Sequence, residues 1–180
     1  MPTPVGHTFA ALTIWTAARP WSLKVLCSPW LWLAILSSNA PDLDFLPGLI
    51  MGNEGLFHRG AGHSVGGAAF YALLVLAAAL LLTRSPGAGL RASMSAFGLF
   101  NLHLLLDLLG QDPGPPHGIK LLWPLTERYF LSPWTVFPNL ERHPFDLSVI
   151  PRAVPVVAFE GLLFGPFILA AFILRRRQGP

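Results

Sequence analysis

Long apolar runs without charge are the main pattern along this chain, and two of them are long enough to cross a membrane. Residues 65–83 form 19 consecutive uncharged positions, which as a helix rising about 1.5 Å per residue nearly match a bilayer core of roughly 30 Å. Residues 153–174 form the second run, with Glu160 as its single charge. Pro155 and Pro166 are expected to bend that helix. The pattern therefore predicts two transmembrane helices.

A third apolar run, residues 92–109, carries polar side chains toward its end. These are Asn101, His103 and Asp107. A polar group facing lipid is costly, so we expect a helix that crosses the membrane only because protein covers its polar face.

The remaining segments give weaker signals. Residues 5–18 and 25–41 predict helices too short to span a bilayer unaided, joined by a turn at Arg19, Pro20 and Trp21. Residues 110–150 are rich in Pro, Trp and charge, which predicts a loop with short helices.

Composition supports a membrane protein. Of the 180 residues, 53% are hydrophobic and 12% are charged, against roughly a quarter charged in soluble domains, which argues against disordered, coiled-coil and ordinary soluble classes. We expect one all-α domain over residues 1–180, a polytopic membrane helical bundle with its motifs in residues 5–125. Cys27 is the sole cysteine, so it is interpreted as a packing residue rather than a disulfide partner.

The distribution of charge predicts a topology. Seven of the twelve basic residues fall at one set of helix ends, whereas eight of the nine acids fall at the other ends and loops. By the positive-inside rule, the basic ends and the C-terminus are expected to be cytoplasmic in a multi-pass inner-membrane protein. Because topology explains the net charge of +3, no nucleic-acid partner is expected. No Lys or Arg precedes the first apolar stretch, so a cleaved signal peptide is not expected.

This threading brings imidazoles and carboxylates from distant segments to the outward helix ends. Such a cluster, without matching Lys or Arg, needs a cation to neutralise it. Imidazole and carboxylate donors without cysteine suit Zn²⁺ first, with Mn²⁺ or Fe²⁺ as alternatives, and their number allows one or two ions. The predicted metal ligands are His7, Asp42, Asp44, His58, His63, His103 and Asp107.

Spacing sharpens two of these groups. His103 and Asp107, four residues apart, share a helix face, as a chelating pair or as a His whose second nitrogen the carboxylate holds; the alternative is a helix cap. Asp42 and Asp44 follow Pro41, which disfavours helical geometry before it, so a turn could aim both carboxylates at one ion. The alternative is an Asp-rich turn without a metal.

A third group, His58 and His63, flanks two glycines. On a regular helix the two rings would diverge by about 140°, so Gly60 and Gly62 are expected to let the chain fold first. Arg59 beside them is a suitable fork for a phosphate or carboxylate; its alternatives are a lipid headgroup or an Asp partner.

Two further ionisable residues remain open. His7, taken alone in an apolar segment, fits a buried core histidine better than a ligand. Glu160 could pair with an Arg or reach the site.

The motifs resemble one bacterial family. His7, the Pro-Asp-x-Asp of residues 41–44, the His-Arg-Gly-x-x-His-Ser of residues 58–64, the His-x-x-x-Asp of residues 103–107 and the Leu-Leu-Trp-Pro of residues 121–124 resemble the YdjM-like, LexA-binding, inner-membrane-associated metal-dependent hydrolases. That family is similar in turn to zinc-dependent phospholipase C and the P1-type nucleases, all-helical enzymes whose metal cluster activates water against a phosphoester. The resemblance implies that fold and that chemistry.

The leading hypothesis is therefore a membrane-bound, metal-dependent hydrolase acting on a lipid or lipid-linked phosphoester at the outward membrane face. Asp42 or Asp44 would serve as general base, and Arg59 would neutralise charge on a phosphoryl oxygen. The alternatives are a non-catalytic protein with a structural metal, a regulatory scaffold, or a transporter that uses Glu160.

Overall fold

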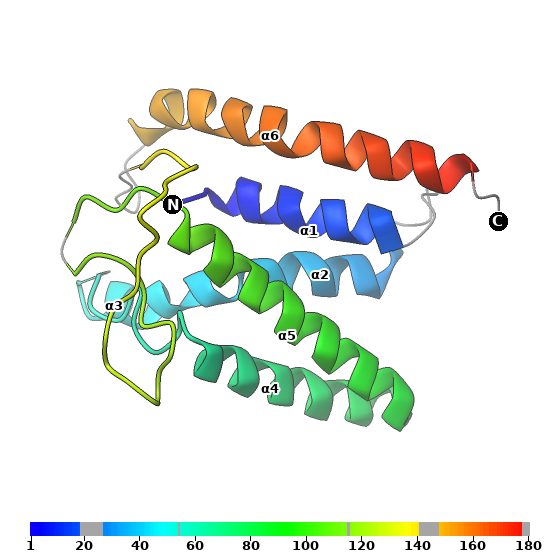
Figure 1. Cartoon of the computed structure of the whole chain (residues 1–180). Coiled ribbons are helices and arrows are strands. Elements are labelled where there is room, and N and C mark those ends of the chain that lie inside the picture. The colour runs from blue at the N-terminus through cyan, green and yellow to red at the C-terminus, as the bar shows by residue number, and fades with distance from the viewer. Residues whose placement is uncertain (19–26, 54, 115, 141–147, 178–180) are drawn as a thin grey trace.

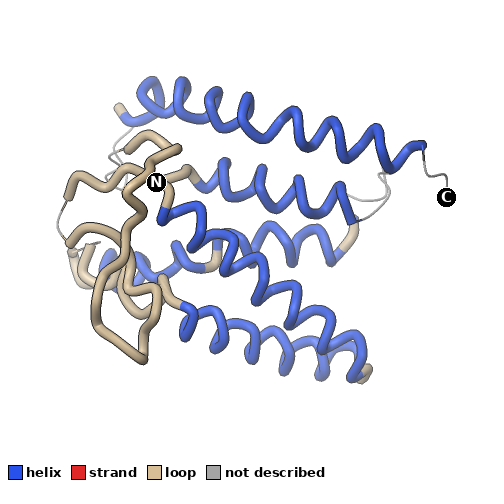
Figure 2. Tube along the Cα trace, viewed as in Figure 1, coloured by secondary structure: helices blue, strands red, loops and turns tan. Residues whose placement is uncertain are grey.

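Helices account for most of the ordered backbone (Figures 1 and 2). The computed structural model describes residues 1–18, 27–53, 55–114, 116–140 and 148–177, and this part of the chain contains no strand. The helices are α1 (Pro4–Ala18), α2 (Pro29–Asn39), the 3₁₀ helix η2 (Pro41–Asp44), α3 (Phe45–Ile50), α4 (Val65–Thr83), α5 (Pro86–Leu108) and α6 (Val149–Arg177).

The long helices lie side by side, and the loops gather at one end of them (Figure 1). The N-terminus lies at this loop end, together with α3 and the long segment that follows α5. The end of α6 and the turn between α4 and α5 lie at the opposite end. Every segment that carries a predicted metal ligand therefore begins or ends at the loop end.

Helices α4 and α6 are the two candidate membrane spans. Each is long and apolar enough to cross a bilayer, and 11% of its apolar window is buried against protein. Large apolar side chains such as Leu74, Leu81 and Leu162 point outward from them, as expected for lipid-facing helices. The structure thus confirms the two strongest helix predictions; α6 continues through Pro155 and Pro166.

The hairpin of α4 and α5 is closed by serine caps and small side chains. Ser64 accepts a hydrogen bond from the Gly67 amide at 2.8 Å, and Ser85 caps α5 ahead of Pro86, as N-cap residues do. Ala68 and Ala96 are fully buried, so the two helices pack closely. The Ser93 hydroxyl donates to the Ala72 carbonyl at 2.8 Å, which adds a polar contact between the two helices.

The structure corrects two predicted helix ranges and the prediction of short helices in the long loop. The helix expected over residues 25–41 begins at Pro29 and ends at Asn39, and η2 takes over because Pro41 has no amide to continue the α-helical hydrogen bonds. The helix expected over residues 92–109 begins six residues earlier, at a serine cap followed by proline. Between residues 110 and 140 the described chain is loop without helices. The predicted turn at residues 19–21 lies outside the described residues.

A buried carboxylate ties α6 to the start of α1. Glu160 is fully buried and accepts hydrogen bonds from the amide and the hydroxyl of Thr3, at 2.6 and 2.5 Å. A side chain at Gly6 would lie 2.6 Å from the Glu160 carboxylate, so this glycine lets the helices approach. Glu160 therefore has a local partner in the N-terminal segment that holds His7.

The close packing of α4 on α5 gives a testable prediction. Ala68→Leu adds three carbons where Ala68 packs in one cluster with Phe100 and Leu104, and overpacking of this kind costs about 1–3 kcal/mol. We expect a lower thermal unfolding midpoint in detergent, followed by circular dichroism. Ala78→Leu, on the exposed face of α4, is the matched control; equal midpoints for the two variants would contradict the packing.

Candidate metal centre

All seven predicted ligands converge at the loop end, which confirms that the helix ends meet in one layer. They form three groups of donors that each lie within 4.8 Å of one another: His7, His103 and Asp107; Asp42, His63 and His103; and Asp44, His58 and His63. His63 and His103 each belong to two groups, so the three groups form one continuous cluster.

Four donor atoms at the centre lie close to one another along four measured edges. Asp42 Oδ1 lies 3.5 Å from His63 Nε2 and 3.7 Å from His103 Nε2. Asp107 Oδ2 lies 3.5 Å and 3.2 Å from the same two nitrogens. Ligands bound to Zn²⁺ at about 2.1 Å in a tetrahedron are about 3.4 Å apart. The four measured edges are close to this spacing, and the donors have the chemistry of a site for a divalent ion.

These central atoms also lack hydrogen bonds. Within the described part of the chain, His63 Nε2, His103 Nε2 and both Asp107 oxygens are buried without a hydrogen-bond partner. A buried polar atom left in this state is costly, and a cation between the four donors would satisfy them. The residues present therefore fit a metal ion.

The other nitrogen of each central histidine is held by a neighbour. His103 Nδ1 lies 2.8 Å from the Ser38 carbonyl oxygen, and His63 Nδ1 lies 2.6 Å from Asp44 Oδ2. A proton on Nδ1 donates to these acceptors and leaves Nε2 with a free lone pair, which is the arrangement that orients metal-binding histidines. Of the alternatives for His103 and Asp107, the arrangement favours the chelating pair: Asp107 lies at Nε2 of His103, and Ser38 holds the second nitrogen.

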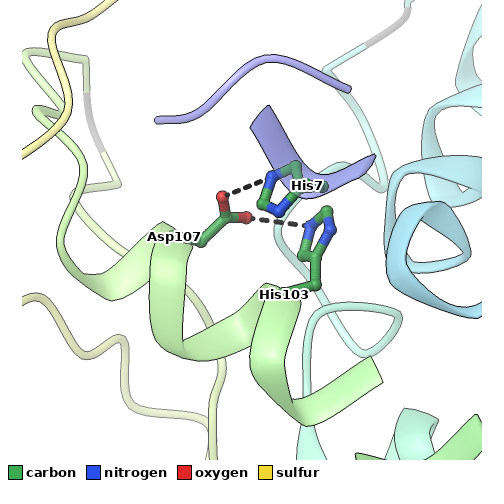
Figure 3. A group of neighbouring side chains, drawn as sticks. All are labelled: His7, His103 and Asp107. Atoms are coloured by element: carbon green, nitrogen blue, oxygen red, sulfur yellow. Dashed lines mark ion pairs between the residues drawn. The ribbon is translucent and has the colours of Figure 1, made fainter. Parts of the chain in front are cut away.

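His7 extends the cluster on the side of α1. Its ring stacks on His103 with centroids 3.7 Å apart, and its Nε2 lies 3.3 Å from Asp107 Oδ1. Figure 3 shows the Asp107 carboxylate beside the stacked pair of rings, with one oxygen directed at each ring. Asp107 could therefore bridge a second ion bound with His7.

Asp44 lies on the outer side of His63. It accepts from His58 Nδ1 at 2.8 Å and from the Arg59 amide at 3.1 Å, in addition to its contact with His63. A side chain at Gly62 would lie 2.7 Å from Asp44 Cβ. Gly62 thus allows a close approach to Asp44, whereas the glycines were expected to provide a fold in the backbone. The left-handed backbone of this loop is at Arg59, with φ of 65°.

The two aspartates of η2 consequently face different groups, Asp42 the central donors and Asp44 the outer pair. Residues two apart on a 3₁₀ helix of three residues per turn cannot share a face. The expectation that one turn aims both carboxylates at the same ion is not what this arrangement shows.

Charge stabilises the rim of the cluster. Burial raises the pKa of the Asp42 carboxyl, but His63 and His103 outweigh this effect and lower it to about 2. Burial lowers the pKa of His63, yet Asp42, Asp44 and Asp107 raise it to about 10, so a metal ion bound at Nε2 would displace a proton from this nitrogen. Burial also raises the pKa of Asp44, and the hydrogen bonds with His58 and His63 lower it overall. Both η2 carboxylates therefore stay ionised and ready to bind a cation.

Arg59 joins the cluster to the long loop. Its guanidinium forms an ion pair with Asp112, whose other oxygen accepts from the Gly118 amide at 2.6 Å. An Asp partner was one of the alternatives for Arg59, and this is the partner observed.

The Leu-Leu-Trp-Pro motif closes the start of α4, directly after His63. The carbonyls of Leu121 and Trp123 accept from the amides of Val65 and Gly66 at 2.9 and 3.1 Å. These are first-turn amides that a helix cannot satisfy internally. The motif therefore holds the loop against the segment that carries His63.

Sequence reasoning missed two supporting groups, Ser38 and Asp112. Ser38 acts through its backbone carbonyl, for which no residue type is a signal. Asp112 stands in a Pro-rich loop, and only its contact with Arg59 distinguishes it from a solvated acid.

Comparison with known proteins confirms the family. A family model described as YdjM inner membrane protein matches residues 1–178, and the chain belongs to this family. It is a membrane protein by family and by its two apolar helices. No curated protein matches the chain, and no solved structure does. The similarity to phospholipase C and P1-type nucleases stays a prediction.

The metal centre can be tested by metal content. We expect near-stoichiometric metal by plasma mass spectrometry in detergent-purified wild type. In His103→Ala the bound metal per protein should fall about tenfold or more, because a donor shared by two groups is removed. His117→Ala is the control, since that ring contacts the Asp112 carbonyl rather than the cluster. Intact helicity must accompany the loss; equal metal in wild type and a folded His103→Ala would contradict the site.

Proposed function

We propose that this member of the YdjM inner membrane protein family is a metal-dependent hydrolase of a phosphoester, with Asp42, His63, His103 and Asp107 as the ligands of its principal ion. The observation that carries the proposal is the central set of four donors, separated by 3.2 to 3.7 Å along the four measured edges. Histidine and carboxylate donors favour Zn²⁺, with Mn²⁺ or Fe²⁺ as alternatives. His7 and Asp107 would hold a second ion.

The chemistry is hydrolysis by water. A divalent ion in this position supplies a Lewis acid and lowers the pKa of water to about 7. Of the four central ligands, Asp42 has the most exposed side chain, at 20%, against 2% for Asp107. Asp42 is therefore the ligand that water and substrate can approach, and we assign it as the general base.

Asp44 has a different role in this proposal. It accepts hydrogen bonds from His58, His63 and the Arg59 amide, which leaves it little capacity to take a proton from water. We assign Asp44 as the positioning residue that fixes the tautomer of His63. His58, whose side chain is 29% exposed, stays a predicted ligand at the outer edge.

Arg59 is proposed to stabilise negative charge on the phosphoryl oxygens. Its ion pair with Asp112 uses Nη1, and its Nε has no hydrogen-bond partner within the described chain. A guanidinium held by one partner keeps further donors for a second anion. Asp112 would thereby orient Arg59 toward the substrate.

The proposed orientation places the metal centre at the outward face of a multi-pass protein, with the C-terminus in the cytoplasm. It is supported by the arginines Arg84, Arg91 and Arg175 at the helix ends away from the cluster, and by the positive-inside rule. An active site at the membrane face suits a lipid or lipid-linked phosphoester.

A structural metal is the second candidate. It is favoured by the near-complete burial of His7, His63, His103 and Asp107, because structural sites are closed and catalytic sites keep an open position. In the hydrolase, substitution of Asp42 should lower turnover and leave stability unchanged. In a protein with a structural metal, it should lower stability.

The catalytic role of Asp42 predicts a specific defect. Asp42→Asn keeps an oxygen donor but removes the base, so we expect kcat to fall about 10²- to 10⁴-fold with near-wild-type thermal stability. Turnover of p-nitrophenyl phosphate and of phosphatidic acid, with Zn²⁺ or Mn²⁺ supplied, measures this. A wild type that hydrolyses neither, with stoichiometric metal and lower stability in Asp42→Asn, would favour the structural metal instead.

The positioning role of Asp44 predicts a defect in metal affinity. Asp44→Asn weakens the acceptor that holds His63 Nδ1. Loss of such a contact lowers metal affinity about 10- to 100-fold. Competition with a chromogenic chelator measures the Kd. Unchanged affinity together with lost activity would instead return the base assignment to Asp44.

A further inference from the structure

An apolar groove lies between α1, α2 and α5, beyond the metal centre. Its volume is about 510 Å³. Ser95 is the one side-chain hydroxyl among its lining residues; the others include Ala11, Trp15, Gly98 and Leu102. Figure 1 shows that α1 and α5 diverge from the loop end.

The groove and the metal centre lie along the same helix seam, the packing interface between α1, α2 and α5. Ala11 lies one turn after His7 on α1, and Leu99 lies one turn before His103 on α5. On α2, Ala34 precedes Ser38 by one turn, and the Ser38 carbonyl holds His103. Residues four apart share a helix face, so the faces that carry the donors also line the groove.

The groove is too narrow for a helix and wide enough for a hydrocarbon chain. From His7 to Ala18, at the far end of the lining, α1 rises about 16 Å, close to one leaflet of a bilayer core about 30 Å thick. The lining on α5 runs from Met94 to Leu102, about 12 Å. The volume divided by this length gives a cross-section of about 40 Å², roughly half that of a helix about 10 Å wide.

We propose that this groove binds one acyl or alkyl chain of a membrane lipid whose phosphoester group reaches the metal centre. The inference rests on the proposed hydrolase function and gives its substrate class, an amphiphile with at least one long hydrocarbon chain. An apolar groove in a membrane protein favours a hydrocarbon occupant over water, and the shared seam aligns the head of that occupant with the four donors.

Gly98 provides a way to fill the groove. A Cβ at this position meets no atom within 4 Å, so Gly98→Leu places its side chain in open space without displacing the fold. Gly87→Leu is the matched control on the same helix: Gly87 does not line the groove, and a Cβ there makes only an ordinary contact with Arg91, at 3.6 Å.

The experiment is photolabelling of the full chain in detergent micelles, with a phosphatidic acid that carries a diazirine near the end of its acyl chain. Peptide mass spectrometry locates the label. We expect labels on groove residues such as Ile14 and Met94 in wild type and Gly87→Leu, and a loss of about tenfold in Gly98→Leu, because excluding even two methylenes from contact costs about that factor. Metal content should be the same in all three proteins.

Different results would overturn the groove and the function separately. Labels confined to the outer faces of α4 and α6, or unchanged by Gly98→Leu, would overturn the chain site even if metal and hydrolysis persist. Groove residues that stay unlabelled in a protein whose mass in detergent is that of a dimer would show a second copy of this protein as occupant and would also overturn it. Groove labelling that Gly98→Leu removes, in a protein that holds no metal, would support the chain site while the proposed hydrolase fails.

Discussion

The buried carboxylate of Asp107 is the constraint on which the rest of the structure depends. Its side chain is 2% exposed and is contacted by His7, His63 and His103, which come from three segments far apart in the chain. A carboxylate removed from water needs positive charge or donors nearby. Meeting that need draws the start of α1, the segment before α4 and the end of α5 to one point.

A second layer of contacts makes this point specific. The Ser38 carbonyl and the Asp44 carboxylate hold the outer nitrogens of His103 and His63, so both rings present Nε2 to the centre. Glu160 binds Thr3 and thereby fixes the segment that precedes His7. The supports come from helices and from backbone carbonyls, so the geometry of the donors is set before any ion binds, which is what tight and selective binding requires.

The same helix seam divides into a polar end and an apolar end. Its donors occupy the first turns of α1 and the last turns of α5, while small and apolar residues such as Ala11, Gly98 and Leu99 line the remainder. The lipid substrate proposed above has this same division into a charged head and a hydrocarbon tail. If the proposal holds, one packing arrangement links the membrane setting to the chemistry.

The sequence by itself determined the membrane class, the helices over residues 65–83 and 153–174 and the set of candidate donors, because hydrophobic run length and residue chemistry are local properties. It also placed the donors at one layer, since helix direction alternates along the chain. Only the tertiary structure decided that Asp42 and Asp44 face different groups, that Asp107 contacts both His7 and His103, and that Arg59 pairs with Asp112. Those outcomes depend on distances between segments up to about a hundred residues apart, which no local pattern encodes.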